Sequence, residues 1–147
     1  MKLKVKKLTD TAKLPTKNLT GDVGYDIYSD EDIDRIPGKI EAIKTGIAIE
    51  IPEGYGALLV GRSGRTSKTP FRVNLGVIDN GYRGELLVMN DVLPDGKKAI
   101  NKVERIRKGD KIAQLIILPI YELDVEEVEE LSITDRGEKG FGSSGMV

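Results

Sequence analysis

The chain of 147 residues carries 23 basic and 24 acidic side chains, so its net charge is −1 and no basic footprint of nucleic-acid binding is present. This length fits one domain with a sizeable core. The longest apolar run, residues 115–120, is far too short to span a bilayer, and no apolar segment follows the N-terminal lysines as a secretory signal requires. We therefore expect a soluble, cytoplasmic protein that binds neither nucleic acid nor membrane.

The sequence contains neither cysteine nor histidine. Without cysteine there can be no disulfide, thiolate nucleophile or Cys-based zinc site. Without histidine the commonest general base and the commonest metal ligand are missing. If the protein is an enzyme, we expect its proton acceptor to be a carboxylate and any metal to be a hard, oxygen-liganded cation such as Mg²⁺.

Short alternating apolar and polar runs, separated by turn residues, make up most of the chain. Strands are predicted at residues 2–7, 25–28, 40–51, 55–60, 71–75, 86–89 and 111–118, with turns at 37–38, 52–54, 93–98 and 108–110. Strands of about five residues with such frequent turns indicate an all-β sandwich or barrel. Val125, Val128 and Leu131 have helical spacing and predict a short helix.

The most informative stretch is GVIDNGYRGE at residues 76–85. Asn80-Gly81 between two β-prone runs predicts a hairpin with a tight primed turn, because both central residues tolerate positive φ. Asp79 and Tyr82 should then face each other at the hairpin mouth. The simpler alternative is an aspartate that opens the turn and bonds its own backbone.

Composition changes at Ser132. Residues 132–147 include four glycines and three serines, with Phe141 as the only aromatic side chain and Ile133 as the only other large apolar one before Met146. Such a segment cannot bury enough surface to order itself. We therefore predict a β domain over residues 1–131 and a mobile arm over residues 132–147. The lone aromatic suggests that the arm docks on something flat.

Five polar, glycine-containing stretches are poor in core-forming residues: DVGYDIYS, GRSGRTSK, GVIDNGYRGE, RKGDKIAQL and RGEKGFGSSG. Each by itself could be a solvated loop. Their chemistry is complementary, because serine hydroxyls and glycine N–H groups form anion nests and arginines grip phosphate with two hydrogen bonds. Asp26 and Asp79 offer oxygens to Mg²⁺ or water, while Tyr82 and Phe141 offer flat faces. Together they describe a site for a nucleoside polyphosphate.

In order and in wording, the five stretches resemble the five motifs of the homotrimeric dUTPase family (dUTP diphosphatases), from about residue 23 to residue 145. The resemblance implies a jelly-roll-like β barrel with a mobile C-terminal arm, assembled as a homotrimer. Each active site would combine the hairpin of one subunit, the phosphate-gripping loops of a second and the arm of a third. The implied reaction hydrolyses dUTP to dUMP and pyrophosphate by attack of water on the α-phosphorus.

The resemblance also implies roles for single residues. Asp79 would orient and deprotonate the water, while Mg²⁺ would bridge the phosphates and contact Asp26 through a water molecule. Phe141 would stack on the uracil. The phosphates would be held by Arg62, Ser63, Gly64, Gln114, Arg136, Gly142, Ser143 and Ser144.

Uracil would be recognised by main-chain groups of the hairpin, which match its acceptor–donor–acceptor edge as a neighbouring strand would. The candidates lie at Asn74, Gly76, Val77, Ile78 and Leu87. Cytosine would leave buried groups unpaired, at a cost of roughly 1–3 kcal/mol each. Tyr82, packed under the sugar, would crowd out a ribose 2′-hydroxyl.

The chain departs from the family pattern at Gly61, where relatives often have proline, and at Arg65, where a small apolar residue is common. The charged residues 96–107 are expected to form a surface loop. Two other functions remain open. One is a related dCTP deaminase, against which the arm and hairpin motifs argue. The other is a dUTPase-like regulatory protein that captures a partner.

Overall fold

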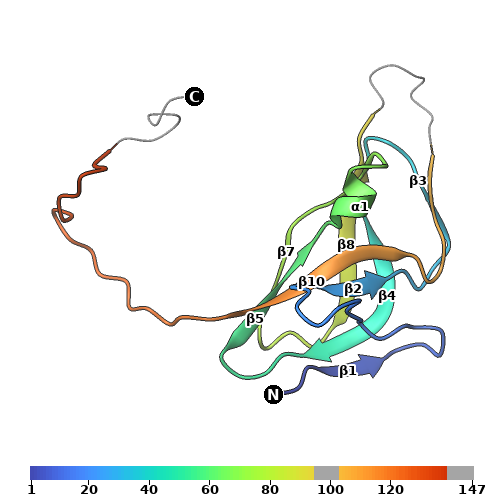
Figure 1. Cartoon of the computed structure of the whole chain (residues 1–147), viewed down its shortest axis with the longest axis horizontal. Coiled ribbons are helices and arrows are strands. Elements are labelled where there is room, and N and C mark those ends of the chain that lie inside the picture. Colours follow the sequence, from blue (N-terminus) through green and yellow to red (C-terminus); the bar gives the residue numbers. More distant parts are fainter. Residues whose placement is uncertain (95–102, 139–147) are drawn as a thin grey trace.

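Ten β-strands and one short helix make up the described part of the chain, residues 1–94 and 103–138 of the computed structural model (Figure 1). The prediction of an all-β fold is confirmed. The elements are β1 (Lys4–Lys7), β2 (Tyr25–Tyr28), β3 (Ile33–Arg35), β4 (Glu41–Glu50), β5 (Tyr55–Val60), α1 (Ser63–Thr66), β6 (Phe71–Val73), β7 (Gly76–Ile78), β8 (Glu85–Val92), β9 (Glu104–Ile106) and β10 (Lys111–Pro119).

Two four-stranded antiparallel sheets enclose the core. One has the strand order β1-β4-β8-β6 and the other β2-β10-β5-β7, while β3 and β9 form a separate pair. Strand β8 shows why this sequence forms a two-layered barrel: Leu86, Val88 and Val92 are buried, while the alternate Leu87 and Met89 are exposed. The buried residues of both sheets form one hydrophobic cluster.

Gly46 lies in the middle of β4, within the strand predicted over residues 40–51. Its φ of 65° lies in the left-handed region, and a Cβ there would lie 2.6 Å from Asp30 Oδ2. The pairing of β4 with β8 shifts register between Lys44 and Ala48. The long strand therefore bends over the core at a β-bulge.

The predicted hairpin at residues 76–85 is wrong in one respect. Strand β7 pairs with β5, and β8 pairs with β4 and β6, so the segment is a corner between the two sheets. The Tyr82 N–H donates to the Asp79 carbonyl at 3.1 Å, but Gly81 does not have a positive φ. The turn is therefore not of the predicted type, in which both central residues have positive φ, and strands that diverge into different sheets do not need the twist of that turn.

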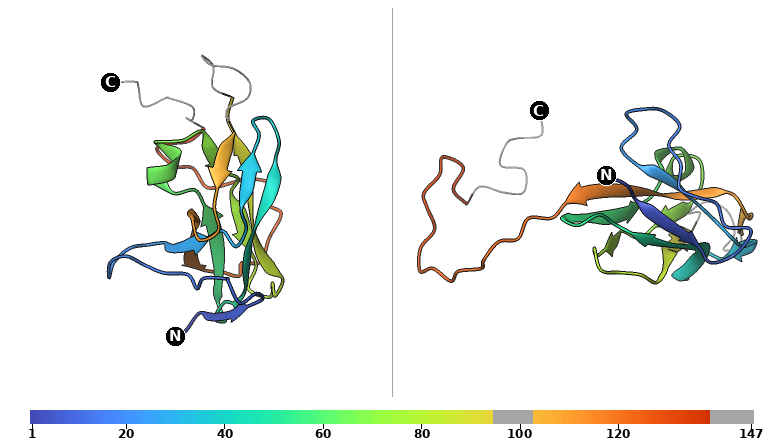
Figure 2. Two further views of the ribbon diagram at one scale, coloured as in Figure 1. Left: turned by 90° about the vertical axis from the view of Figure 1, so that its right-hand side faces the viewer. Right: turned by 90° about the horizontal axis from the view of Figure 1, so that it is seen from below.

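Beyond β10 the chain leaves the barrel. Residues 120–138 contain neither helix nor strand, and they extend away from the two sheets in Figure 1 and in the right-hand view of Figure 2. The short helix predicted around residues 125–131 is therefore wrong. Apolar side chains of this segment are exposed, including Val125 at 99% and Ile133 at 100%. The proposed boundary at residue 131 stays a prediction.

Part of the charged stretch 96–107 is a strand rather than a loop, because β9 pairs with β3 over Ile33–Ile106, Asp34–Arg105 and Arg35–Glu104. Residues 95–102 lie outside the described residues, as do four predicted arm residues: Phe141, Gly142, Ser143 and Ser144.

Candidate active site

Asp79 lies at the rim of a small pocket between the two sheets. The pocket has a volume of about 160 Å³ and is lined by Val77, Ile78, Asp79, Tyr82, Glu85 and Leu87. Asp79 follows the last residue of β7 and is exposed. No hydrogen bond or ion pair joins its side chain to another described residue. The carboxylate is therefore free to accept a proton from a water molecule in the pocket.

Two strand edges border this pocket. Strand β7 ends the order of its sheet, and β6 covers β8 only from Asn90 to Val92. Leu87 lies beyond that covered part. Main-chain groups of two strands thus stand at the mouth, as the prediction for a uracil edge requires. Asn74 contributes less, because its N–H already donates to the Met89 carbonyl at 2.9 Å.

The ring of Tyr82 is held in place by its own turn. Its hydroxyl donates to the Glu85 carbonyl at 2.9 Å. A Cβ on Gly84 would lie 2.5 Å from that hydroxyl oxygen, so a larger residue there would displace the ring from this position. The aromatic face is thus fixed beside Asp79 in the pocket.

A second cluster surrounds Asp26, which is 3% exposed in β2. Its Oδ1 accepts a hydrogen bond from Arg62 Nε at 2.8 Å, and its Oδ2 forms an ion pair with Lys111 Nζ at 2.7 Å. Burial raises the pKa of Asp26, but the hydrogen bond from Lys111 and the charge and hydrogen bond of Arg62 outweigh it, so the pKa lies below its ordinary value. Asp26 is therefore ionised at neutral pH.

Sequence reasoning missed Lys111 as a member of this cluster. It is the first residue of β10, paired with Tyr28 of β2, so its side chain reaches the neighbouring Asp26. The available signal was a lysine directly after the Gly-Asp turn at the start of a strand that carries Gln114.

The other predicted phosphate contacts adjoin this cluster. Gln114 of β10 is paired with Asp26 on one side and with Val60 of β5 on the other. Two residues after Val60 comes Arg62, the N-cap of α1, whose first residues Ser63 and Gly64 are exposed. The first N–H groups of a helix have no partner within it and can donate to an anion. The site can therefore bind a polyphosphate.

The two clusters lie at opposite ends of β5. Ile78 pairs with Ala57, so Asp79 lies beside Gly56, six residues before Arg62. At about 3.3 Å per residue along a strand, the two clusters are roughly 20 Å apart in one chain. The predicted residues therefore form two groups within the chain. Arg136 lies in the exposed segment after β10 and belongs to neither.

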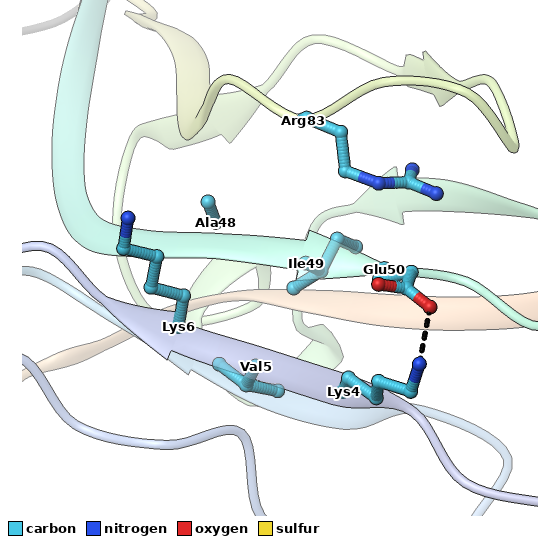
Figure 3. A pocket seen from close by; sticks show the side chains of 7 residues that line it. All are labelled: Lys4, Val5, Lys6, Ala48, Ile49, Glu50 and Arg83. Carbon is cyan, nitrogen blue, oxygen red and sulfur yellow. Dashed lines mark hydrogen bonds and ion pairs between the residues drawn. The ribbon is translucent and has the colours of Figure 1, made fainter.

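A larger groove of about 320 Å³ lies beside β1 and the end of β4, facing Arg83 (Figure 3). It is lined by Lys4, Val5, Lys6, Ala48, Ile49, Glu50 and Arg83. Glu50 is paired with Lys4 at 2.6 Å. None of the predicted site residues lines it, so size alone does not identify the active site.

No helix in the described residues is long and apolar enough to cross a membrane.

Comparisons with known proteins agree with this geometry. A family model described as dUTPase matches residues 10–145. The deoxyuridine 5′-triphosphate nucleotidohydrolase of Clostridioides difficile is 45% identical over 98% of each chain, and that of Gloeothece citriformis is 41% identical over 100% of this chain and 99% of the relative.

Solved structures give the same result. The dUTPase of Staphylococcus bacteriophage 80alpha with dUPNHPP is 40% identical, with a TM-score of 0.89 over 99% of each chain. A mutant dUTPase of phage phi11, described as coordinating a structural Mg(II) ion, is 35% identical, with a TM-score of 0.80 over 88% of this chain and 98% of that one. From the matching family model and these relatives, the chain belongs to the dUTPase family.

Proposed function

We propose that the chain hydrolyses dUTP to dUMP and pyrophosphate in a homotrimer, with Asp79 as the general base for water attack on the α-phosphorus. The observation that carries this proposal is the exposed carboxylate of Asp79, which is paired with no other described residue and lies at the rim of a pocket bordered by two strand edges. A positioned base of this kind contributes about 10²–10⁴ in rate.

The pocket fits a uracil nucleoside. Main-chain groups at Gly76, Val77, Ile78 and Leu87 would pair with the acceptor–donor–acceptor edge of the base. Tyr82, held over Gly84, would pack under the deoxyribose. Cytosine reverses part of the hydrogen-bond pattern and would leave buried groups unpaired, which accounts for selectivity.

The triphosphate would be held by a second subunit. Its contacts would come from Arg62, Ser63, Gly64 and Gln114. Since Arg62 lies roughly 20 Å from Asp79 in one chain, the two groups would meet across a subunit boundary. A ring of three identical chains brings the two ends of β5 together three times through the same head-to-tail contact.

A third subunit would contribute the arm. Residues 120–138 present exposed apolar side chains outside their own barrel, which is the state of a segment that packs on a neighbour. Arg136, Gly142, Ser143 and Ser144 would close over the γ-phosphate, and Phe141 would stack on the uracil. Closure would exclude bulk water from the reaction.

The residues present are compatible with Mg²⁺ bound mainly by water and substrate oxygens. Within the described residues, no three acidic side chains converge on a metal site. Asp26 is ionised, and although both oxygens are paired, a carboxylate can accept about four hydrogen bonds, which leaves room for a metal-bound water. When bound, Mg²⁺ would neutralise charge on the phosphates.

The test is hydrolysis of dUTP by the purified chain with Mg²⁺ in ¹⁸O-labelled water. We expect dUMP and pyrophosphate, with the label in dUMP, because the water attacks the α-phosphorus. Asp79→Asn should bind a non-hydrolysable dUTP analogue as the unmodified chain does, yet lose about 10²–10⁴ in turnover. Ammonia release from dCTP, or full turnover by Asp79→Asn, would overturn the proposal.

A further inference from the structure

The side chain of Asn80, next to Asp79, binds a separate turn of the protein. Its Nδ2 donates to the carbonyl oxygens of Ile51 at 3.2 Å, Pro52 at 2.7 Å and Tyr55 at 2.8 Å. Ile51 and Pro52 belong to the connection between β4 and β5, and Tyr55 is the first residue of β5. An amide nitrogen has two hydrogens, so one of them is shared between two carbonyls.

The turn that receives Asn80 is itself well fixed. Pro52 restricts its own φ, Gly54 takes the positive φ of 77° that the turn needs, and the Tyr55 N–H donates to the Pro52 carbonyl at 3.2 Å. Tyr55 then begins β5, the strand that pairs with β7. Asn80 thus fastens the end of β7 to the beginning of its partner strand.

Other side chains of the Asp79 turn do not make such a connection. Arg83 donates to the Asn80 and Tyr82 carbonyls, and Tyr82 donates to the Glu85 carbonyl, so these bonds stay within residues 79–85. Among the described residues, the side-chain hydrogen bonds that join residues 79–84 to a distant segment all come from Asn80. The Asp79 side chain lacks such bonds, so its place depends on the backbone that Asn80 holds.

We propose that Asn80 is a positioning residue, which holds the backbone of Asp79 so that its carboxylate meets the attacking water. This inference rests on the proposed role of Asp79 as general base. A displacement of about 1 Å at a reacting group can cost about 10²-fold in rate. Loss of the three hydrogen bonds should therefore lower turnover while the uracil pocket and the distant phosphate cluster remain intact.

The experiment compares Asn80→Ala and Asn80→Asp with Glu53→Ala in the full-length chain. Asp has the shape of Asn, but its ionised carboxylate cannot donate to three carbonyls. Glu53 is an exposed residue of the same turn, and its side chain takes no part in the three bonds. We expect kcat to fall about 10- to 100-fold in both Asn80 variants. The KM for dUTP and the affinity for a non-hydrolysable analogue should stay close to those of the unmodified chain. The melting temperature should fall by roughly 3–9 °C because three hydrogen bonds are lost, and Glu53→Ala should keep full activity.

Turnover within about twofold of the unmodified chain in Asn80→Ala would overturn the inference, on the scale expected for a misplaced base. So would a parallel collapse of melting temperature and analogue binding, which would show a purely structural role. If Asn80→Ala does not fold, Asn80→Ser, which keeps one donor, is judged by the same measurements. Asp79→Asn is assayed beside them: if it retains turnover, the proposed base is wrong and Asn80 positions nothing catalytic. If Asp79→Asn loses turnover while the Asn80 variants keep it, the proposed base stands and only the positioning role of Asn80 fails.

Discussion

Replacing Asp26 with asparagine tests the cluster at the phosphate end of β5. The substitution keeps the shape of the side chain but removes the charge that pairs with Arg62 at 2.8 Å and with Lys111 at 2.7 Å. The side-chain oxygen of asparagine can still accept the hydrogen bond from Arg62. Its NH₂ group would face the Lys111 ammonium group, and since both are donors, no hydrogen bond can form between them. The two cations then lose their shared counter-ion.

The expected cost follows from the burial of the three groups. A hydrogen bond to a charged group contributes about 1.5–3 kcal/mol, and two such bonds are affected. The side chains of Arg62 and Lys111 remain 24% and 31% exposed, so water partly compensates them. We therefore expect a loss of about 2–4 kcal/mol. At roughly 3 °C per kcal/mol for a chain of this size, the melting temperature should fall by roughly 6–12 °C.

The assay is thermal unfolding in metal-free buffer, at one protomer concentration, between pH 7.5 and pH 3. Because the pKa of Asp26 is lower in the folded protein than in the unfolded chain, its stabilisation is present at neutral pH and is lost as the pH falls through the folded pKa. The difference between Asp26→Asn and the unmodified chain should therefore be largest at pH 7.5 and shrink in acid.

Asp10→Asn serves as the control, since Asp10 is an exposed carboxylate. It should leave the melting temperature unchanged throughout. A melting temperature for Asp26→Asn within about 2 °C of the unmodified chain at pH 7.5, on the same scale of roughly 3 °C per kcal/mol, would refute the reasoning. A difference that stays constant into acid would refute it as well.

Two further predictions concern the assembly and the support of α1. The first mixes inactive Asp79→Asn chains with inactive Arg62→Ala chains, unfolds them and refolds them together. Because each site takes the two residues from different chains, about a quarter of the sites in randomly mixed trimers should be active. If no activity returns, Asp79 and Arg62 of the same chain serve the same site. Arg65 of α1 donates to Glu104 of β9 at 2.9 Å, with both side chains 14% exposed, and lies 4.9 Å from the Phe71 ring. In urea titrations, Arg65→Ala and Glu104→Ala should each lower the free energy of unfolding by about 1–3 kcal/mol. The effect of the double variant should differ from the sum of the two single effects by about 1 kcal/mol. Strictly additive effects would show that the pair does not interact.

The order of residue types along the chain predicts those features that depend on residues close together in the sequence. Alternation of apolar and exposed side chains in β8 shows which face enters the core, since side chains of a strand alternate between its two sides. The Asn80-Gly81 signal located the turn correctly, yet it predicted the wrong turn type. Its flanking strands join different sheets, and nothing within ten residues encodes that separation.

The sequence by itself determined the all-β class, the position of Asp79 at a turn and the chemical types needed for a polyphosphate. Only the tertiary structure showed that Asp26 is paired with Arg62 and Lys111, which lie 36 and 85 residues away in the sequence. It also showed that Asp79 lies at the opposite end of β5 from these three residues. The physical reason is strand register. Which residues become neighbours across a sheet depends on pairing between distant segments, and that pairing is settled by burial of the whole core.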